Sequence, residues 1–329
     1  MMARLHRIDF RQMTSRLLLA VLMVGTIAST ACKKSASNYE LDDELARLSA
    51  YRQIHYPSSK EDSNGAFHQT LASTSGQAIS SGQWLYFDFA AYDLNGALLS
   101  TTQAHVAKGN GMYDRTVHYV PGYVKVDERE WGSSMFKVLT AARVGDSIVM
   151  GLPSTALGSK QLWGRSSYRS ALCYMVLREA VVNPKAHELD RIREYMKTHA
   201  GFQARDSVYV HTVASGNGAN IAADTYIWVR YSCYFLDGTL LETNSDEVAQ
   251  QHDVYSPSGN KYNLVGLNAK DASSKIRGIR NVLVGQKVGC RVQLLVPSEV
   301  AYGEKGNAKV RPYEPLLYDI TVVRSNTKK

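Results

Sequence analysis

The sequence predicts an α+β protein made of two copies of one unit, each with a leader helix, an antiparallel β-sheet and a short helix. Three observations predict this class. Segments of the first half recur in the second half, strand-like segments alternate with glycine-containing turns, and a helical pattern precedes the strands. With 329 residues the chain is long enough for two domains, each able to bury its own core.

The internal repeat has a period of about 140 residues, which indicates two whole domains and not a solenoid of short repeats. Five pairs of segments match in the same order. They are 44–51 with 188–195, 92–99 with 234–241, 133–139 with 273–279, 144–146 with 284–286, and 152–154 with 296–298. The similarity of five ordered pairs makes a duplication the simplest interpretation.

The second copy opens with a predicted helix. Leu189, Ile192 and Met196 recur at steps of three and four residues, which is the spacing of one helix face. Pro184 lies near the start of this pattern and Gly201 just past its end, where helices commonly begin and stop.

The rest of the second copy has the composition of strands joined by turns. β-Branched and aromatic residues are concentrated in short segments, and Gly, Asn and Asp gather between them. The predicted strands are 208–211, 225–231, 288–296 and 316–323, the turns are 215–218 and 236–239, and a short helix is expected at about 274–284. One helix among several antiparallel strands indicates a half-wrapped sheet.

The N-terminal segment has the order of a secretory signal peptide. Four Arg residues precede the apolar stretch 17–25, and small residues then lead to Cys32. The small-small-Cys ending is similar to a bacterial lipobox, which predicts a signal peptide over residues 1–31 and a lipid on Cys32. The alternative is ordinary cleavage near Ala31 beside a cysteine with no special role.

Composition argues against several other functions. The first 31 residues hold four Arg and one Asp, so the mature chain is less basic than the formal net charge of +8, and no basic patch interleaved with aromatics predicts nucleic-acid binding. Histidines lack metal-ligand spacing, and no nucleophile or phosphate-binding motif is present. Cys233 and Cys290 fall in one copy and are interpreted either as a disulfide or, more simply, as apolar strand residues.

The second copy resembles the FKBP (FK506-binding-protein) family of peptidyl-prolyl cis-trans isomerases over residues 207–324. Four elements carry the resemblance: V-R-Y at 229–231 followed by L-D-G-T-L-L-E at 236–242, G-I at 278–279 with V-G-Q-K at 284–287, P-S-E-V-A-Y-G at 297–303, and P-L-L-Y-D-I at 315–320. The resemblance implies rotation of X–Pro bonds without any cofactor or metal. It also implies that 184–206, a connecting helix, corresponds to the leader helix of FKBP lipoproteins.

The resemblance also implies a pocket. Tyr302 matches the tyrosine whose hydroxyl donates to the bound peptide, and Glu242 and Tyr231 complete the expected catalytic set. The expected substrate-binding walls are apolar or aromatic, and they are Leu241, Tyr262, Leu264, Ile279, Val310 and Tyr318.

Two features depart from the family. Glu242 stands where the family has Asp, and the Trp of the pocket floor is replaced by Lys275 in an ungapped alignment or by Ile279 in a gapped one. Both departures bear on catalytic strength.

The first copy, residues 81–181, has diverged further. At the positions of Tyr231, Leu241, Glu242, Tyr302 and Tyr318 it has Phe89, Leu99, Ser100, Leu157 and Cys173, in that order. Because it lacks both the loop phenol and the carboxylate, this copy is interpreted as a degenerate domain kept for structure or binding.

The predicted protein is therefore a lipid-anchored segment with a leader helix (32–80), the degenerate domain, the connecting helix and an isomerase domain. The expected function is assistance to exported, proline-containing polypeptides in the cell envelope, from an outer membrane and facing the periplasm. The alternative is a non-catalytic FKBP-fold chaperone or scaffold in an outer-membrane assembly. The expected partners are the membrane and such polypeptides, with no nucleic acid.

The lipid anchor can be tested with Cys32→Ala. The wild-type protein is expected to incorporate labelled palmitate and to partition into the detergent phase of Triton X-114, because acyl chains contribute about 0.8 kcal/mol per buried methylene. The variant is expected to lose both properties. Equal membrane association of the two proteins would contradict the assignment.

Overall fold

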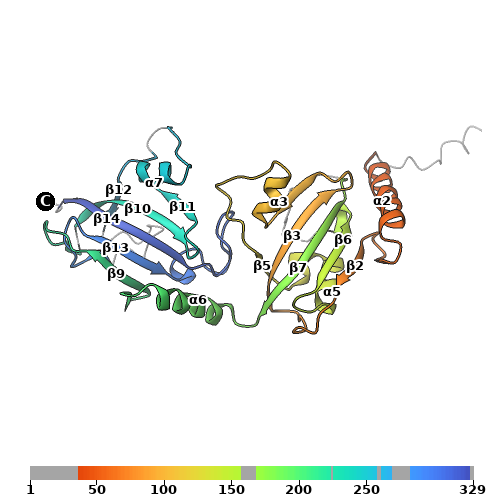
Figure 1. Cartoon of the computed structure of the whole chain (residues 1–329), viewed down its shortest axis with the longest axis horizontal. Coiled ribbons are helices and arrows are strands. Elements are labelled where there is room, and N and C mark those ends of the chain that lie inside the picture. Colours follow the sequence, from red (N-terminus) through yellow and green to blue (C-terminus); the bar gives the residue numbers. More distant parts are fainter. Residues whose placement is uncertain (1–35, 157–167, 224, 258–260, 269–281, 327–329) are drawn as a thin grey trace, which may run out of the picture.

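The computed structural model describes residues 36–156, 168–223, 225–257, 261–268 and 282–326. Two antiparallel sheets lie side by side along the long axis of the molecule, and each carries a few helices (Figure 1). This arrangement confirms the predicted α+β class.

The first unit contains a leader helix, seven strands and short helices on one face of the sheet. Its elements are α2 (Ala36–His55), β1 (Lys60–Glu61), β2 (Phe67–Ala72), β3 (Trp84–Asp93), β4 (Leu98–Thr101), α3 (Ala104–Gly109), β5 (Gly122–Lys125), α4 (Glu128–Trp131), α5 (Ser133–Ala141), β6 (Ser147–Leu152), η2 (Ser154–Ala156) and β7 (Ala171–Val181). The strand order is β1-β2-β6-β7-β3-β4, and β5 pairs with β3.

The second unit repeats this arrangement after a connecting helix. Its elements are α6 (Pro184–Thr198), β8 (Gln203–Arg205), β9 (Val208–Ala214), β10 (Tyr226–Phe235), β11 (Leu240–Thr243), α7 (Asp246–Gln251), β12 (Val265–Asn268), β13 (Arg291–Val296), η3 (Ser298–Val300) and β14 (Leu316–Asn326). The order β8-β9-β13-β14-β10-β11, with β12 pairing β10, is the order of the first sheet.

Irregularities of the two sheets are duplicated as well. The central pair β3 and β7 shifts register between Tyr86 and Phe87, and the pair β10 and β14 shifts between Trp228 and Val229. Each hairpin also shifts after one residue pair, Ala91 opposite Ser100 in one unit and Cys233 opposite Glu242 in the other. Matching bulges at matching positions show that the two units share one backbone plan, because bulges mark specific positions in a sheet.

The helix signals of the second copy are confirmed. Asn183 caps α6 by accepting a hydrogen bond from the backbone N–H of Ala186, and Pro184 occupies the first turn, where its missing N–H costs nothing. The chain leaves the helix before Gly201, whose φ of +101° suits glycine.

The start of one predicted strand differs from the structure. The strand expected from Val288 begins at Arg291, because Gly289 turns the chain with a φ of +89° and the backbone N–H of Cys290 bonds back to Lys287. Most of the helix expected at 274–284 lies outside the described residues. Its last residues, Val282 and Leu283, are helical and fully buried.

Each sheet buries one face against its own core. The alternation of strand side chains sends Cys173, Met175 and Leu177 of β7 into the first core, which also receives the buried face of α5. The second core gathers residues of β10, β13 and β14 in the same way. No helix among the described residues is long and apolar enough to cross a membrane.

A buried carboxylate fastens each leader helix to its sheet. Glu44 of α2 is 4% exposed and accepts hydrogen bonds from the backbone N–H and the hydroxyl of Ser154, both at 2.6 Å, and from Ser170. Glu188 of α6 is also 4% exposed and accepts from the N–H and the hydroxyl of Ser298. Burial raises the pKa of Glu188, while the bonds from Ser298 oppose that rise.

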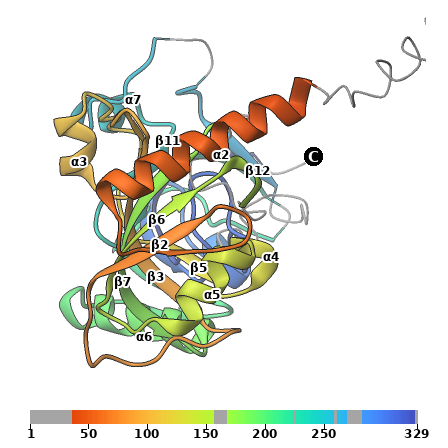
Figure 2. The ribbon, with the colours of Figure 1, turned by 90° about the vertical axis from the view of Figure 1, so that its right-hand side faces the viewer.

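The first leader helix crosses one end of its sheet (Figure 2), where Leu48 packs with Phe67 of β2 and Leu172 of β7. The matching contact of α6 joins Ile192 with Leu295 and Leu317. The Pro-Ser pairs and the Glu-Leu pairs found in the sequence repeat therefore belong to one structural device, a leader helix fixed across its sheet.

Replacing Glu188 tests this device. Glu188→Ala leaves the buried N–H of Ser298 without a partner and removes two hydrogen bonds, so the free energy of unfolding of the second unit is expected to fall by about 2–4 kcal/mol. Urea unfolding followed by circular dichroism measures the change. The matched control is Glu194→Ala on the same helix, which removes only an exposed pair with Lys197 and is expected to leave stability nearly unchanged. A similar loss in both variants would contradict this role of Glu188.

Candidate active site of the second unit

Tyr231 and Glu242 face each other across the β10–β11 hairpin. The Tyr231 hydroxyl donates to Oε1 of Glu242 at 3.3 Å, and the Glu242 side chain is exposed. Burial, followed by the nearby negative charge of Glu242, raises the pKa of Tyr231, so this phenol keeps its proton at neutral pH. Leu241, the neighbour of Glu242, packs against the core.

Buried polar residues after β11 hold this hairpin in place. Asn244 is 3% exposed; its Oδ1 accepts from the backbone N–H of Tyr231 at 2.6 Å, and its Nδ2 donates to the carbonyls of Val229 and Asn263. The Thr243 hydroxyl donates to the carbonyl of Tyr231. The sequence analysis did not identify Asn244. Its position between a strand and a helix N-cap is a signal for a side chain that hydrogen-bonds to the neighbouring backbone.

Tyr302 lies after η3, at the point where Gly303 turns the chain with a φ of +65°. Its half-buried ring packs against the second core. Burial, and then the nearby carboxylate of Glu242, raise the pKa of Tyr302. The hydroxyl of Tyr302 therefore keeps its proton and can donate a hydrogen bond.

The floor beneath these groups is formed by the last strand. Tyr318 of β14 is 4% exposed and stands opposite Cys233 of β10, and its ring centroid is 6.2 Å from that of Tyr231. Burial raises the pKa of Tyr318 strongly. Val310 is buried in the same core. The structure thus brings together the three predicted catalytic residues with Leu241, Val310 and Tyr318.

Tyr262 contacts residues outside this group. The Tyr262 ring stacks on Tyr255 at 5.1 Å, and its hydroxyl accepts from the backbone N–H of Ser256 at 2.9 Å. Leu264 is half-buried just before β12. Ile279, together with its alternative Lys275 and with Cys32, lies outside the described residues.

The first unit has a different interior at the matching place. Phe89 is buried where the second unit has Tyr231, and Cys173 is fully buried where it has Tyr318, whereas Leu99 is exposed beside Ser100. Leu157 lies outside the described residues. No phenol or carboxylate occupies the described positions of this copy that match Tyr231, Tyr318 and Glu242.

Aromatic packing fills this interior. The Phe87 ring meets Trp131 edge-on at 5.0 Å and Phe89 at 6.0 Å, and Trp131 is 2% exposed with its indole N–H bonded to the carbonyl of Lys125. The second unit has the smaller Val229 at the position of Phe87. Aromatic side chains therefore fill the interior of the first copy at this place.

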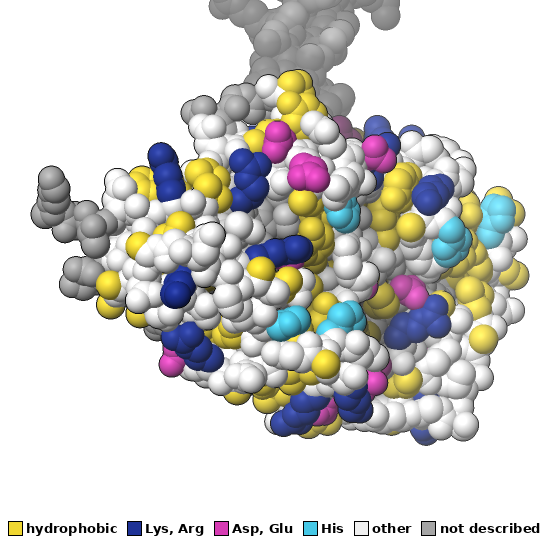
Figure 3. Space-filling view, turned by 60° about the vertical axis from the view of Figure 1, so that its left-hand side comes forward, with side chains coloured by type: hydrophobic (Ala, Val, Ile, Leu, Met, Phe, Trp, Pro, Cys, Tyr) yellow, Lys and Arg dark blue, Asp and Glu magenta, His cyan; other side chains and the backbone are white. Residues whose placement is uncertain are grey.

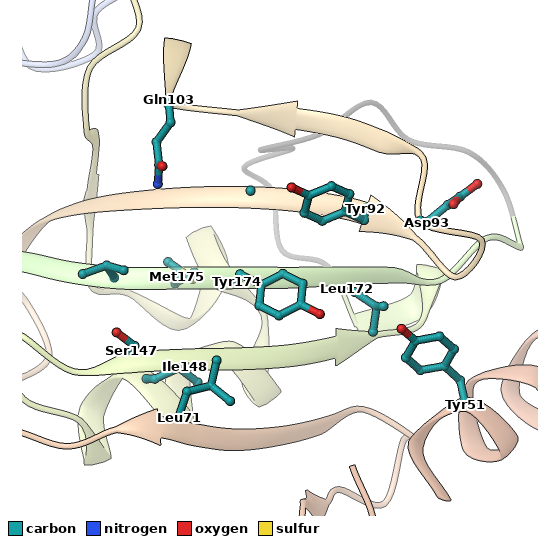
Figure 4. Close-up of a pocket in the computed structure, with 13 residues that line it drawn as sticks. Tyr51, Leu71, Tyr92, Asp93, Gln103, Ser147, Ile148, Leu172, Tyr174 and Met175 are labelled. Atoms are coloured by element: carbon teal, nitrogen blue, oxygen red, sulfur yellow. The ribbon is translucent and has the colours of Figure 1, made fainter. Parts of the chain in front are cut away.

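A cavity of about 630 Å³ lies instead on the opposite, outer face of the first sheet. Figure 4 shows Tyr92 and Tyr174 on neighbouring strands, with Tyr51 approaching from α2. The rings of Tyr92 and Tyr174 meet edge-on at 5.9 Å, and the exposed Leu71 forms part of the wall. This surface is apolar and aromatic with hydroxyls at its edge.

The described residues contain no cluster of His, Cys, Asp and Glu suited to a metal ion. On the face of the molecule in Figure 3, acidic and basic side chains are interspersed, and no basic patch stands out. The described cysteines 173, 233 and 290 are free and buried, so the disulfide alternative for Cys233 and Cys290 is wrong and the core interpretation holds.

The fold and the site together define an open antiparallel sheet domain that presents protonated phenols and one carboxylate at the edge of an apolar core. Residues 218–323 match the family model described as FKBP-type peptidyl-prolyl cis-trans isomerase. Residues 218–323 thus form an FKBP-type domain within the second unit, and the first unit repeats its strand order.

The chain is similar to the three FKBP domains of wheat FKBP73 (12% identity, 82% of this chain and 100% of that chain, TM-score 0.31). It is also similar to a peptidyl-prolyl isomerase of Pseudomonas syringae (21%, 44% and 97%, 0.33) and to FkpA of Escherichia coli (18%, 44% and 61%, 0.34). No curated protein sequence matched. Because these likenesses are low, the family assignment depends on the match of residues 218–323.

The buried thiols provide a test of the site's packing. Burial raises the pKa of Cys173, Cys233 and Cys290, so their thiolate forms are scarce at pH 8. Burial also keeps thiol reagents away from the three sulfur atoms. The native chain without Cys32 is expected to react with Ellman's reagent only after unfolding, and then to release three thiols without prior reduction. Fast reaction of the folded chain would contradict this packing.

Proposed function

We propose that the second unit catalyses cis-trans isomerisation of X–Pro bonds, with Tyr302 as the hydrogen-bond donor to the bound peptide. The observation that supports this most is the gathering of Tyr302, Tyr231 and Tyr318 around Glu242, above an apolar core. The family match of residues 218–323 supports the same activity.

The reaction needs no nucleophile. Rotation of an X–Pro bond requires loss of amide resonance, and its barrier is about 20 kcal/mol. The twisted bond carries less charge separation than the planar one, so a site with low polarity favours the twisted form over the planar form that water solvates well. An apolar site that holds the carbonyl is sufficient.

The residues then have distinct tasks. Tyr302 donates to the substrate carbonyl, and its raised pKa keeps the donor proton in place. Tyr231 supports the carboxylate of Glu242 through its hydrogen bond, and the Tyr318 ring and Leu241 form the apolar surface for the proline ring.

The proposed setting is the cell envelope, with proline-containing exported polypeptides as substrates. The order of basic, apolar and small residues before Cys32 supports export and attachment by lipid. Attachment to an outer membrane, facing the periplasm, would place the two units where exported chains fold.

A second candidate is a non-catalytic chaperone or scaffold role in an outer-membrane assembly. The observation that favours it is the first unit, whose interior is filled by Phe87 and Trp131 while Tyr51, Tyr92 and Tyr174 line an open cavity on the other face. Such a unit is suited to holding a polypeptide without reacting with it.

The two candidates differ in the effect of Tyr302→Phe. Loss of one hydrogen bond to the transition state costs about 1–3 kcal/mol, so kcat/KM on a proline tetrapeptide is expected to fall about five- to a hundredfold. A protease-coupled assay measures this ratio.

The matched control is Tyr92→Phe, which removes a hydroxyl from the outer face of the first unit and is expected to leave kcat/KM unchanged. Absence of activity in the wild-type chain would support the non-catalytic candidate. An equal fall of kcat/KM in both variants would contradict the assignment of the site to the second unit.

A further inference from the structure

The two units meet through the loop that follows Tyr302. Tyr313 of this loop is 7% exposed and packs with Trp84, Tyr86, Tyr123 and Val181, all from the first unit. The Tyr313 ring meets Trp84 edge-on at 5.1 Å. An aromatic cluster with residues from both units is a fixed contact, because such rings bury large areas.

Charged groups extend this contact. Glu314 is 1% exposed and pairs with Arg191 of α6 at 2.6 Å and with Arg311 at 2.5 Å. Arg311 also donates to the carbonyl of Pro121 in the first unit at 2.7 Å, and its guanidinium lies 5.5 Å from the Tyr86 ring centroid. The buried carboxylate therefore has two cationic partners, as a buried charge requires.

A second contact lies beside the first. The ring of His118 in the first unit stacks on Phe235 at 3.7 Å, and its Nε2 is 2.7 Å from Oδ2 of Asp237 in the turn after β10. The hydrogen bond with His118 lowers the pKa of Asp237. The two contacts together prevent the second unit from turning freely about either one.

The loop connects this interface to the proposed site. The backbone N–H of Tyr313 donates to the carbonyl of Gly303 at 3.1 Å, and Gly303 follows Tyr302 directly. At the other side of Tyr302, Ser298 is held by Glu188, one helical turn from Arg191 on α6. The connecting helix thus anchors both ends of the segment that carries Tyr302 and Val310.

We propose that the first unit positions the site loop of the second unit, with Trp84 and Tyr313 as positioning residues. This inference rests on the proposed isomerase function. A donor phenol on a loop gives its full effect only when the loop is held, since small displacements of catalytic groups cost large factors in rate. The degenerate copy therefore contributes to catalysis without a site of its own.

The first leader helix has no matching clamp at the equivalent arginine. Arg47 occupies the repeat position of Arg191, is exposed, and pairs with Asp43 on its own helix at 2.7 Å. The side chain of Arg191 on α6 is instead 27% exposed and pairs with the buried Glu314. The clamp is thus a feature of the copy that carries Tyr302.

The test compares Trp84→Ala with Trp84→Phe in the full chain. Trp84→Ala removes the partner of Tyr313, so hydrogen exchange at the amides of Gly303 and Tyr313 is expected to speed up, and kcat/KM is expected to fall about fivefold or more. Trp84→Phe keeps a ring against Tyr313 and is expected to restore most of both. If the Ala variant does not fold, Trp84→Leu takes its place.

The matched control is Leu172→Ala, which also removes a buried side chain from the first sheet but packs against α2, far from the loop. It is expected to change neither the exchange at 303–313 nor kcat/KM. Unchanged exchange in Trp84→Ala, or faster exchange with unchanged kcat/KM, would overturn the inference. A wild-type chain without isomerase activity would overturn the proposed function alone, because the exchange result still reports whether the first unit holds the loop.

Discussion

The buried carboxylate on each leader helix is the constraint on which the other features of the structure depend. A carboxylate with 4% exposure is costly unless donors satisfy it, and Glu188 obtains them from the N–H and hydroxyl of Ser298. Ser298 begins the short turn that leads to Tyr302, so a single pair of hydrogen bonds sets the distance between the helix and the site loop. Arg191 lies one turn further along α6 and pairs with Glu314, which fixes the far end of the loop to the same helix. Helix, loop and sheet are therefore fixed with respect to one another by buried polar contacts and not by packing alone.

The fold could be predicted from the sequence because its signals are local or periodic. The helix of 184–198 has a cap, a proline and a glycine at the expected places, and the strands show β-branched and aromatic residues between turns. Because the sequence is repeated, the same helix and strands are predicted for the first half. The start of β13 differs from the prediction because the turn at Gly289 depends on a hydrogen bond from its N–H to the carbonyl of Val322, which is distant in sequence.

The site could be predicted only in part. Tyr231, Glu242 and Tyr302 lie in motifs of recognisable spacing, whereas no sequence pattern indicates that Tyr262 stacks on Tyr255 and accepts a hydrogen bond from Ser256. The contact of Trp84 with Tyr313 left no sequence signal, because each residue by itself has the pattern of an ordinary strand or loop aromatic. Contacts between units join residues far apart in the chain, and no local pattern reports them.

The two copies combine one backbone plan with different interiors. Both retain the sheet order, the bulges and the buried glutamate, which are the features that the fold itself requires. They differ in the interior, where Phe87 and Trp131 fill the first unit and Val229 leaves the second less crowded at that position. The proposed reaction needs only a donor to the substrate carbonyl and an apolar surface, and the second unit has both. The first copy then has to supply only a rigid contact for the loop. Its aromatic packing gives that copy a rigid interior. The contact with the second unit is at Tyr313, whose backbone N–H donates to the carbonyl of Gly303, the residue after Tyr302. The shared fold and the different interiors thus fit the proposal that the second unit acts on substrate while the first unit holds its site loop in place.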